Sequence, residues 1–170
     1  MLLLRVVAMS ASKGTMWAAV AISIVALIVA GSSYFIRPSA PVIGPTTHTF
    51  TFTGHEFAFD VTGDASGTNP TIRVKVGDIV KIVFKNSGGL THEFLIVEDK
   101  DEAIAAEKTG GEAELPFGFE IEDVDPGKEG TVTFVASHSG SFFYVCFEDA
   151  GTAPDLHAEK GMFGQFIVEA

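Results

Sequence analysis

The chain of 170 residues is 46% apolar and contains fifteen phenylalanines, so its composition is that of a folded protein. All 22 acidic residues follow position 40, where only eight of the eleven basic residues lie, which gives this part a net charge of about −14. Because it has no basic stripe that could replace the counterions of phosphate groups, nucleic acid is excluded as a partner.

The N-terminal part contains a candidate membrane segment. Residues 16–36 carry no charge and, at about 1.5 Å per residue, are long enough to span a hydrocarbon core of roughly 30 Å. Arg5 and Lys13 precede this segment, so the positive-inside rule places residues 1–15 in the cytoplasm and the C-terminal domain in the extracellular or periplasmic space. We predict a single-pass anchor, retained as a transmembrane helix or as an uncleaved signal. A cleaved signal peptide is the alternative.

A linker and one domain follow the predicted anchor. Residues 37–47, RPSAPVIGPTT, contain three prolines and show neither a helical nor a strand period, which predicts a semi-rigid spacer. Residues 48–170 are numerous enough to bury one core, but too few for two.

The pattern of residues 48–170 predicts short strands separated by turns. In residues 71–76, for example, Ile72, Val74 and Val76 alternate with polar residues and share one face. Residues 100–109 are expected to form either one short helix or an acidic loop. Seven or eight strands at this spacing are typical of an antiparallel β-sandwich. The candidate strands are 48–53, 56–61, 71–76, 79–86, 92–97, 131–136, 141–147 and 163–169.

Candidate metal ligands gather near the end of the chain. Cys146 is the only cysteine, so it forms no internal disulfide, and it is either an inert core thiol or a ligand. His157 and Met162 follow it in the same inter-strand loop. Such soft and borderline ligands suit copper, and two histidines, one cysteine and a weak axial methionine form the blue-copper site. His92, at the start of a predicted strand, is the candidate for the second histidine.

These segments together resemble the cupredoxin family of type 1 blue copper proteins, of the plastocyanin- or sulfocyanin-like kind. The resemblance covers residues 48–170 and implies a Greek-key β-sandwich with one type 1 copper that carries single electrons. It assigns His92, Cys146, His157 and Met162 as the ligands. The matching segments are PTIRVKVGDIVKIVFKN, the histidine of THEFLIV, TVTFVASHSGSFFYVC, the H-x4-M spacing and GQFIVEA.

The sequence departs from the family pattern at two places. Ten residues separate Cys146 from His157, where the family usually has two to four, so the site is expected to be distorted or more open. This insertion also makes Glu148 and Asp149 alternatives to Met162 as the axial ligand. Glu93 stands where the family often has Asn, and it either accepts backbone hydrogen bonds that tie the ligand loops or points outward.

The sequence therefore predicts a single-electron carrier at the outer face of the cytoplasmic membrane, in a respiratory chain. Its partners would be a membrane oxidase or a cytochrome-like donor or acceptor, and its acidity serves either solubility or steering towards a basic partner. His157 would be the exit for electrons if its ring edge reaches the surface.

Other functions find less support in the sequence. No nucleophile–base pair or catalytic carboxylate couple is evident, so we predict that the protein is not an enzyme. A copper-storage or delivery protein and a copper enzyme with an open coordination position are the alternatives. A binuclear copper centre would need a second cysteine. The remaining histidines, which are predicted to be structural or exposed, are His48, His55 and His138.

Overall fold

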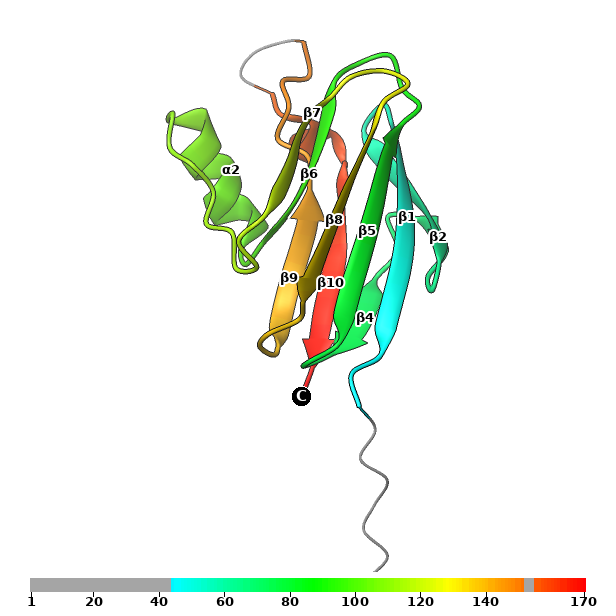
Figure 1. Cartoon of the computed structure of the whole chain (residues 1–170). Helices are drawn as coiled ribbons and strands as arrows, with labels where there is room; N and C mark the ends of the chain where they lie inside the picture. Colours follow the sequence, from blue (N-terminus) through cyan, green and yellow to red (C-terminus); the bar gives the residue numbers. More distant parts are fainter. Residues whose placement is uncertain (1–43, 152–154) are drawn as a thin grey trace, which may run out of the picture. The chain divides into compact units, whose positions relative to one another are not determined.

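The computed structural model describes residues 44–151 and 155–170, which form a two-layered β-sandwich with one α-helix at its side (Figure 1). The predicted cytoplasmic segment 1–15, the predicted anchor 16–36 and most of the spacer 37–47 lie outside the described residues. Within the described part of the chain, no helix has both the length and the apolar character needed to cross a membrane.

Each layer of the sandwich is a five-stranded sheet. The first sheet has the spatial order β3-β2-β1-β5-β8 and consists of β1 (Thr47–His55), β2 (Ala58–Gly63), β3 (Gly67–Thr68), β5 (Ile79–Asn86) and β8 (Glu129–Val135). The second has the order β4-β10-β9-β6-β7 and consists of β4 (Ile72–Lys75), β6 (His92–Val97), β7 (Glu120–Val124), β9 (Gly140–Val145) and β10 (Phe163–Glu169).

All eight predicted strands are present, but the described residues form ten strands, so the predicted number of seven or eight was too low. The two strands that the sequence did not reveal are β3, which has two residues, and β7, in which only Ile121 and Val124 are buried. Neither has the alternation on which strand prediction depends. The acidic segment contains helix α2 (Lys100–Lys108), capped by Asp99, whose side chain accepts hydrogen bonds from two backbone amides.

The sequence predicted an antiparallel sandwich, but two of the strand pairs are parallel. β1 pairs in parallel with β5, and β10 pairs in parallel with β4. A parallel pair needs a long crossover connection. Between β1 and β5 the chain supplies it by passing through β4, which belongs to the other sheet.

Aromatic side chains fill the space between the sheets. Phe52, Phe59, Phe84, Phe94 and Tyr144 are fully buried and contact one another with ring centroids 4.7 to 6.1 Å apart. The Tyr144 hydroxyl donates to the carbonyl of residue 70 at 2.6 Å, so its burial leaves no unpaired polar group. A β-carbon on residue 164 would lie 2.1 Å from the same hydroxyl oxygen, which explains the glycine there.

A smaller apolar cluster covers part of the second sheet and positions the end of the chain. Leu95 and Val97 of β6 and Val145 of β9 pack with Ala103 of α2 and with Ala158 of the 3₁₀-helix η1 (His157–Lys160). The turns that follow β5, β7 and β9 lie together at one end of the sandwich, at the top of Figure 1. The start of β1 and the C-terminus lie at the other end.

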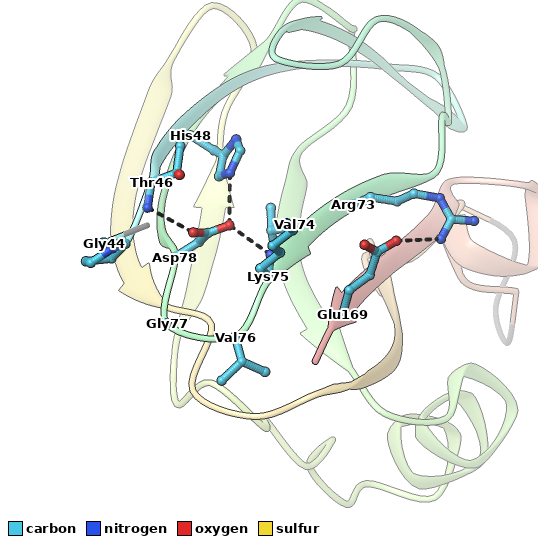
Figure 2. Close-up of a pocket in the computed structure, with 11 residues that line it drawn as sticks. Gly44, Thr46, His48, Arg73, Val74, Lys75, Val76, Gly77, Asp78 and Glu169 are labelled. Atoms are coloured by element: carbon cyan, nitrogen blue, oxygen red, sulfur yellow. Dashed lines mark hydrogen bonds and ion pairs between the residues drawn. The ribbon is translucent and has the colours of Figure 1, made fainter. Parts of the chain in front are cut away.

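At this other end, Asp78 ties the entry of the domain to the β4–β5 turn (Figure 2). Asp78 is 6% exposed, and its carboxylate accepts hydrogen bonds from the amides of Thr46 and Lys75, at 2.9 and 2.8 Å, and from His48 Nε2 at 3.1 Å. It borders a pocket of about 510 Å³. Burial alone would raise the pKa of Asp78, but these hydrogen bonds together hold it below its ordinary value.

Replacing Asp78 by Asn should lower the free energy of unfolding by about 1–3 kcal/mol, because an amide cannot accept all three hydrogen bonds. A lowered pKa in the folded state adds stability above the ordinary pKa of 3.8 and loses it as the pH falls further. The deficit of Asp78→Asn, measured by urea unfolding, should therefore shrink between about pH 5 and about pH 2. Asp101→Asn, at a side chain 86% exposed, is the control. An equal deficit at both pH values would contradict the assignment.

Candidate metal centre

The four residues singled out from the sequence come from three segments at the top of the sandwich. His92 begins β6, Cys146 directly follows β9, and His157 begins η1. Met162 directly precedes β10, and its carbonyl accepts a hydrogen bond from the Cys146 amide at 3.2 Å. The pairing of β9 with both β6 and β10 thus brings together residues that are up to seventy positions apart.

Three of these side chains converge on one point. The Nδ1 atoms of His92 and His157 are 3.1 Å apart, and Cys146 Sγ lies 3.8 Å from the first and 3.3 Å from the second. These separations suit donors that share one metal ion through bonds of about 2.0 to 2.3 Å. All three residues are 0% exposed. In the described residues, the group of His, Cys, Asp or Glu side chains that could hold a metal is this cluster of two histidines and one cysteine.

Burial keeps all three donors uncharged in the absence of a metal. Burial, reinforced by the charge of His157, lowers the pKa of His92 to about 4, and burial also lowers the pKa of His157. Both imidazoles are therefore neutral at physiological pH, with lone pairs available. Burial raises the pKa of Cys146 far above its ordinary value, so the thiol needs a metal cation to become a thiolate.

Glu93 connects the segment of His92 to that of Cys146 through both its backbone and its side chain. Its backbone amide donates to Cys146 Sγ at 3.4 Å, and its carboxylate Oε1 accepts from the Phe147 amide at 2.6 Å. Of the two roles considered for this residue, the structure shows the tether between loops. Burial, together with the charges of Glu148, Glu107 and Glu120, raises the pKa of Glu93 to about 7, although the Phe147 hydrogen bond opposes this shift.

The ten-residue loop between Cys146 and His157 leaves all three donors fully buried, so the more open site expected from its length is not found. The Ala158 amide donates to the Cys146 carbonyl at 2.8 Å, and the His157 amide donates to the Glu148 carbonyl at 2.9 Å. These bonds close the loop at its base, beside Cys146 and His157. These two bonds, and not the number of residues in the loop, therefore set the distance between Cys146 and His157.

The insertion also places no carboxylate in the cluster of donors. Asp149 is exposed and its Oδ1 accepts from the Gly151 amide at 2.9 Å. Burial and the nearby Asp123 raise the pKa of Glu148. Within the described residues, neither carboxylate belongs to the group formed by the three donors. Met162, by contrast, is 0% exposed, and its amide donates to the His157 carbonyl at 3.1 Å.

The condition set for His157 as the exit for electrons, a ring edge at the surface, is not met. His157 is fully buried, and the ring of Phe57 packs edge-on against it with centroids 5.2 Å apart. Phe57 and its neighbour Glu56 belong to the turn between β1 and β2, and sequence reasoning did not identify them.

The other three histidines lie outside the cluster, as predicted. His48 pairs with Asp64 and Asp78, and His55 pairs with Asp60. His138 stacks on Phe117 with ring centroids 5.2 Å apart.

A β-sandwich of this topology with a buried His–Cys–His cluster at one end defines a cupredoxin-type blue copper protein, and the cofactor that suits the cluster is one type 1 copper ion. The chain belongs to the multicopper oxidase family, whose sequence model matches residues 39–170. The resemblance to cupredoxins is thus confirmed. No curated protein matches the chain.

Several solved structures share the fold. Reduced auracyanin from the photosynthetic bacterium Roseiflexus castenholzii is 22% identical, with a TM-score of 0.53 over 75% of this chain and 99% of that one. Rusticyanin from Thiobacillus ferrooxidans is 25% identical, with a TM-score of 0.54 over 74% of this chain and 79% of its own. Auracyanin B is 20% identical, with a TM-score of 0.52 over 74% and 91%.

Replacing Glu93 by Ala should loosen the connection between the ligand segments, because the Phe147 amide loses its acceptor. We expect a loss of about 1–3 kcal/mol in the free energy of unfolding and faster removal of copper by a chelator. Glu93→Gln keeps an acceptor oxygen and should resemble the wild type in both measurements. If Gln and Ala behave alike, the hydrogen bond to Phe147 is not the tether.

Proposed function

We propose that the protein is a single-electron carrier whose type 1 copper is held by His92, Cys146 and His157, with Met162 as the axial ligand. The observation that carries this proposal is the convergence of two imidazole Nδ1 atoms and one thiol sulfur within 3.8 Å of one another in a fully buried site. This donor set is that of blue-copper centres.

The chain's own residues suit an electron carrier because they hold the donors in place and exclude water. Bound copper would supply the redox chemistry by alternating between Cu(I) and Cu(II). Glu93 fixes the loop of Cys146, and the backbone bonds of residues 157–162 fix His157 and Met162. Ligands that cannot rearrange keep the two oxidation states similar in structure. The Glu93 amide on Cys146 Sγ contributes to the potential.

Two other functions fit the observations less well. A storage or delivery protein needs a site that opens readily, whereas these donors are buried, and the paired strands β6, β9 and β10 hold the segments that carry them. An enzyme with an open coordination position needs access for a substrate. Three pockets of the described residues, of about 510, 520 and 330 Å³, are lined by none of the three donors.

The family name raises the possibility of an oxidase with several coppers. Such an enzyme needs further ligand clusters, and the described residues 44–151 and 155–170 contain one group of suitable donors. Two of the structural neighbours, an auracyanin and a rusticyanin, are described in a reduced form, which agrees with reversible redox chemistry in proteins of this fold. These points favour a carrier over an oxidase.

Copper-loaded protein should show an intense thiolate-to-copper absorption band and a narrow copper hyperfine splitting in its EPR spectrum. Both features arise from a short, covalent bond between the thiolate and Cu(II). A colourless protein that binds only Cu(I) would overturn the proposal. Cys146→Ser should abolish the band, and persistence of the colour in this variant would show that the ligand set is wrong.

We further propose that residues 16–36 anchor the protein in the cytoplasmic membrane, with the copper domain on the outer face. Support comes from the uncharged length of this segment and from the preceding Arg5 and Lys13. A membrane position suits a carrier in a respiratory chain, with a membrane oxidase or a cytochrome-like protein as donor or acceptor. The acidic surface would steer a basic partner.

The full-length chain should therefore remain in the membrane fraction after alkaline extraction, and a chain that begins at residue 44 should be released. Protease added outside spheroplasts should digest the domain. Recovery of the full-length chain in the soluble fraction, or protection of its domain from external protease, would contradict this arrangement.

A further inference from the structure

The turn between β1 and β2 has an unusual backbone. His55 pairs with Ala58, so Glu56 and Phe57 form a two-residue connection. Phe57 has a φ of 64°, a left-handed conformation that such turns normally assign to Gly or Asn. A bulky residue in this region is strained and persists only where the surroundings hold it in place. The turn therefore has contacts that outweigh the strain.

Those contacts lead to both histidines of the metal site. Phe57 packs on the His157 ring, as described above. Glu56 Oε1 accepts a hydrogen bond from the Gly89 amide at 2.5 Å, in the loop that leads to His92. The carbonyl of Gly54 accepts bonds from the amide and hydroxyl of Ser87, at 2.8 and 3.2 Å. The turn is thus fixed to the segments of both ligands.

The Nε2 atoms of these two histidines, on the side of each ring away from the other donors, lack hydrogen-bond partners. His92 Nε2 and His157 Nε2 are buried, and neither has a hydrogen-bond partner within the described part of the chain. When Nδ1 binds a metal, the proton of the imidazole is on Nε2, and ligand histidines usually donate this N–H to a carboxylate, a carbonyl or a water. The Nε2–H of His92 therefore lacks an acceptor that the site should provide.

The Glu56 carboxylate is placed to be that acceptor. A β-carbon on Gly88 would lie 3.0 Å from His92 Nε2 and 3.1 Å from Glu56 Oε1, so the two atoms are within about 6 Å, a range over which charges interact strongly. Gly88, which has no side chain, lies against both atoms. The Gly89 hydrogen bond keeps the pKa of Glu56 below its ordinary value, so the carboxylate is charged at neutral pH.

We propose that Glu56 is a positioning residue of the metal site, whose carboxylate receives the Nε2–H of His92 and favours the more highly charged oxidation state of the metal. Glu56 does not touch the metal and acts through the imidazole. This inference rests on the proposed function for the identity of the metal. It adds that the β1–β2 turn forms the outer wall of the site, with Glu56 on His92 and Phe57 on His157.

The test is a redox titration of the full-length, copper-loaded protein. Removing a negative charge near the metal favours Cu(I), so Glu56→Gln should raise the reduction potential. We expect the ratio of Cu(II) affinity to Cu(I) affinity to fall about tenfold, which corresponds to a rise of about 59 mV in the potential of a one-electron couple. Glu56→Asp keeps the charge and should lie closer to the wild type. Gly88→Ala, which places a methyl group between the two side chains, should raise the potential as well.

Glu98→Gln is the matched control. It removes the same charge from an exposed residue just beyond the other end of β6, the strand that His92 begins, and should leave the potential nearly unchanged. A shift in Glu56→Gln no larger than that in Glu98→Gln overturns the inference. Absence of the thiolate-to-copper band in the wild type would instead count against the proposed function.

A measurement without copper keeps the inference testable in that case. In the metal-free protein labelled with ¹⁵N, Glu56→Gln should shift the Nε2 resonance of His92, because the acceptor loses its charge. Glu98→Gln should not shift it. An unchanged His92 resonance in Glu56→Gln would show that the carboxylate does not interact with this histidine, whatever metal the site binds.

Discussion

The structure depends on keeping three metal donors in one place from which water is excluded. Two neutral imidazoles and a protonated thiol are tolerable inside a protein, but none would remain at 3.1 to 3.8 Å from the others without a rigid frame. The frame is the pairing of β9 with both β6 and β10, which fixes where Cys146 lies relative to His92 and Met162. The aromatic core beneath these strands makes that pairing resistant to deformation.

The contacts around the donors repeat one arrangement, in which a glutamate carboxylate accepts a hydrogen bond from a backbone amide of a segment that carries a ligand. Glu93 reaches from the β6 segment to the loop after Cys146, and Glu56 reaches from the β1–β2 turn to the loop before His92. Each carboxylate finds its partner in a backbone amide, so neither needs a basic side chain beside the metal. An otherwise acidic domain can in this way build a compact site.

Parts of this site could be read from residue types and spacing. The order of histidine, cysteine, histidine and methionine is visible in the chain, and so is the alternation that buries Phe142 and Tyr144 and directs Cys146 inward. Strand β7 was missed because Glu120–Val124 lacks alternation. The length of the loop after Cys146 was a poor guide to the openness of the site, since two backbone hydrogen bonds close that loop at its base.

By itself, then, the sequence determined the all-β class, eight of the strands and the residues that could bind copper, because these follow from local periodicity and from the chemistry of each side chain. Only the tertiary structure decided that His157 is covered by Phe57, that Glu93 connects two loops and that Glu56 stands beside His92. These features join segments thirty or more residues apart. Such contacts depend on how the two sheets stack and how each turn is directed, and no local pattern in a single sequence encodes them.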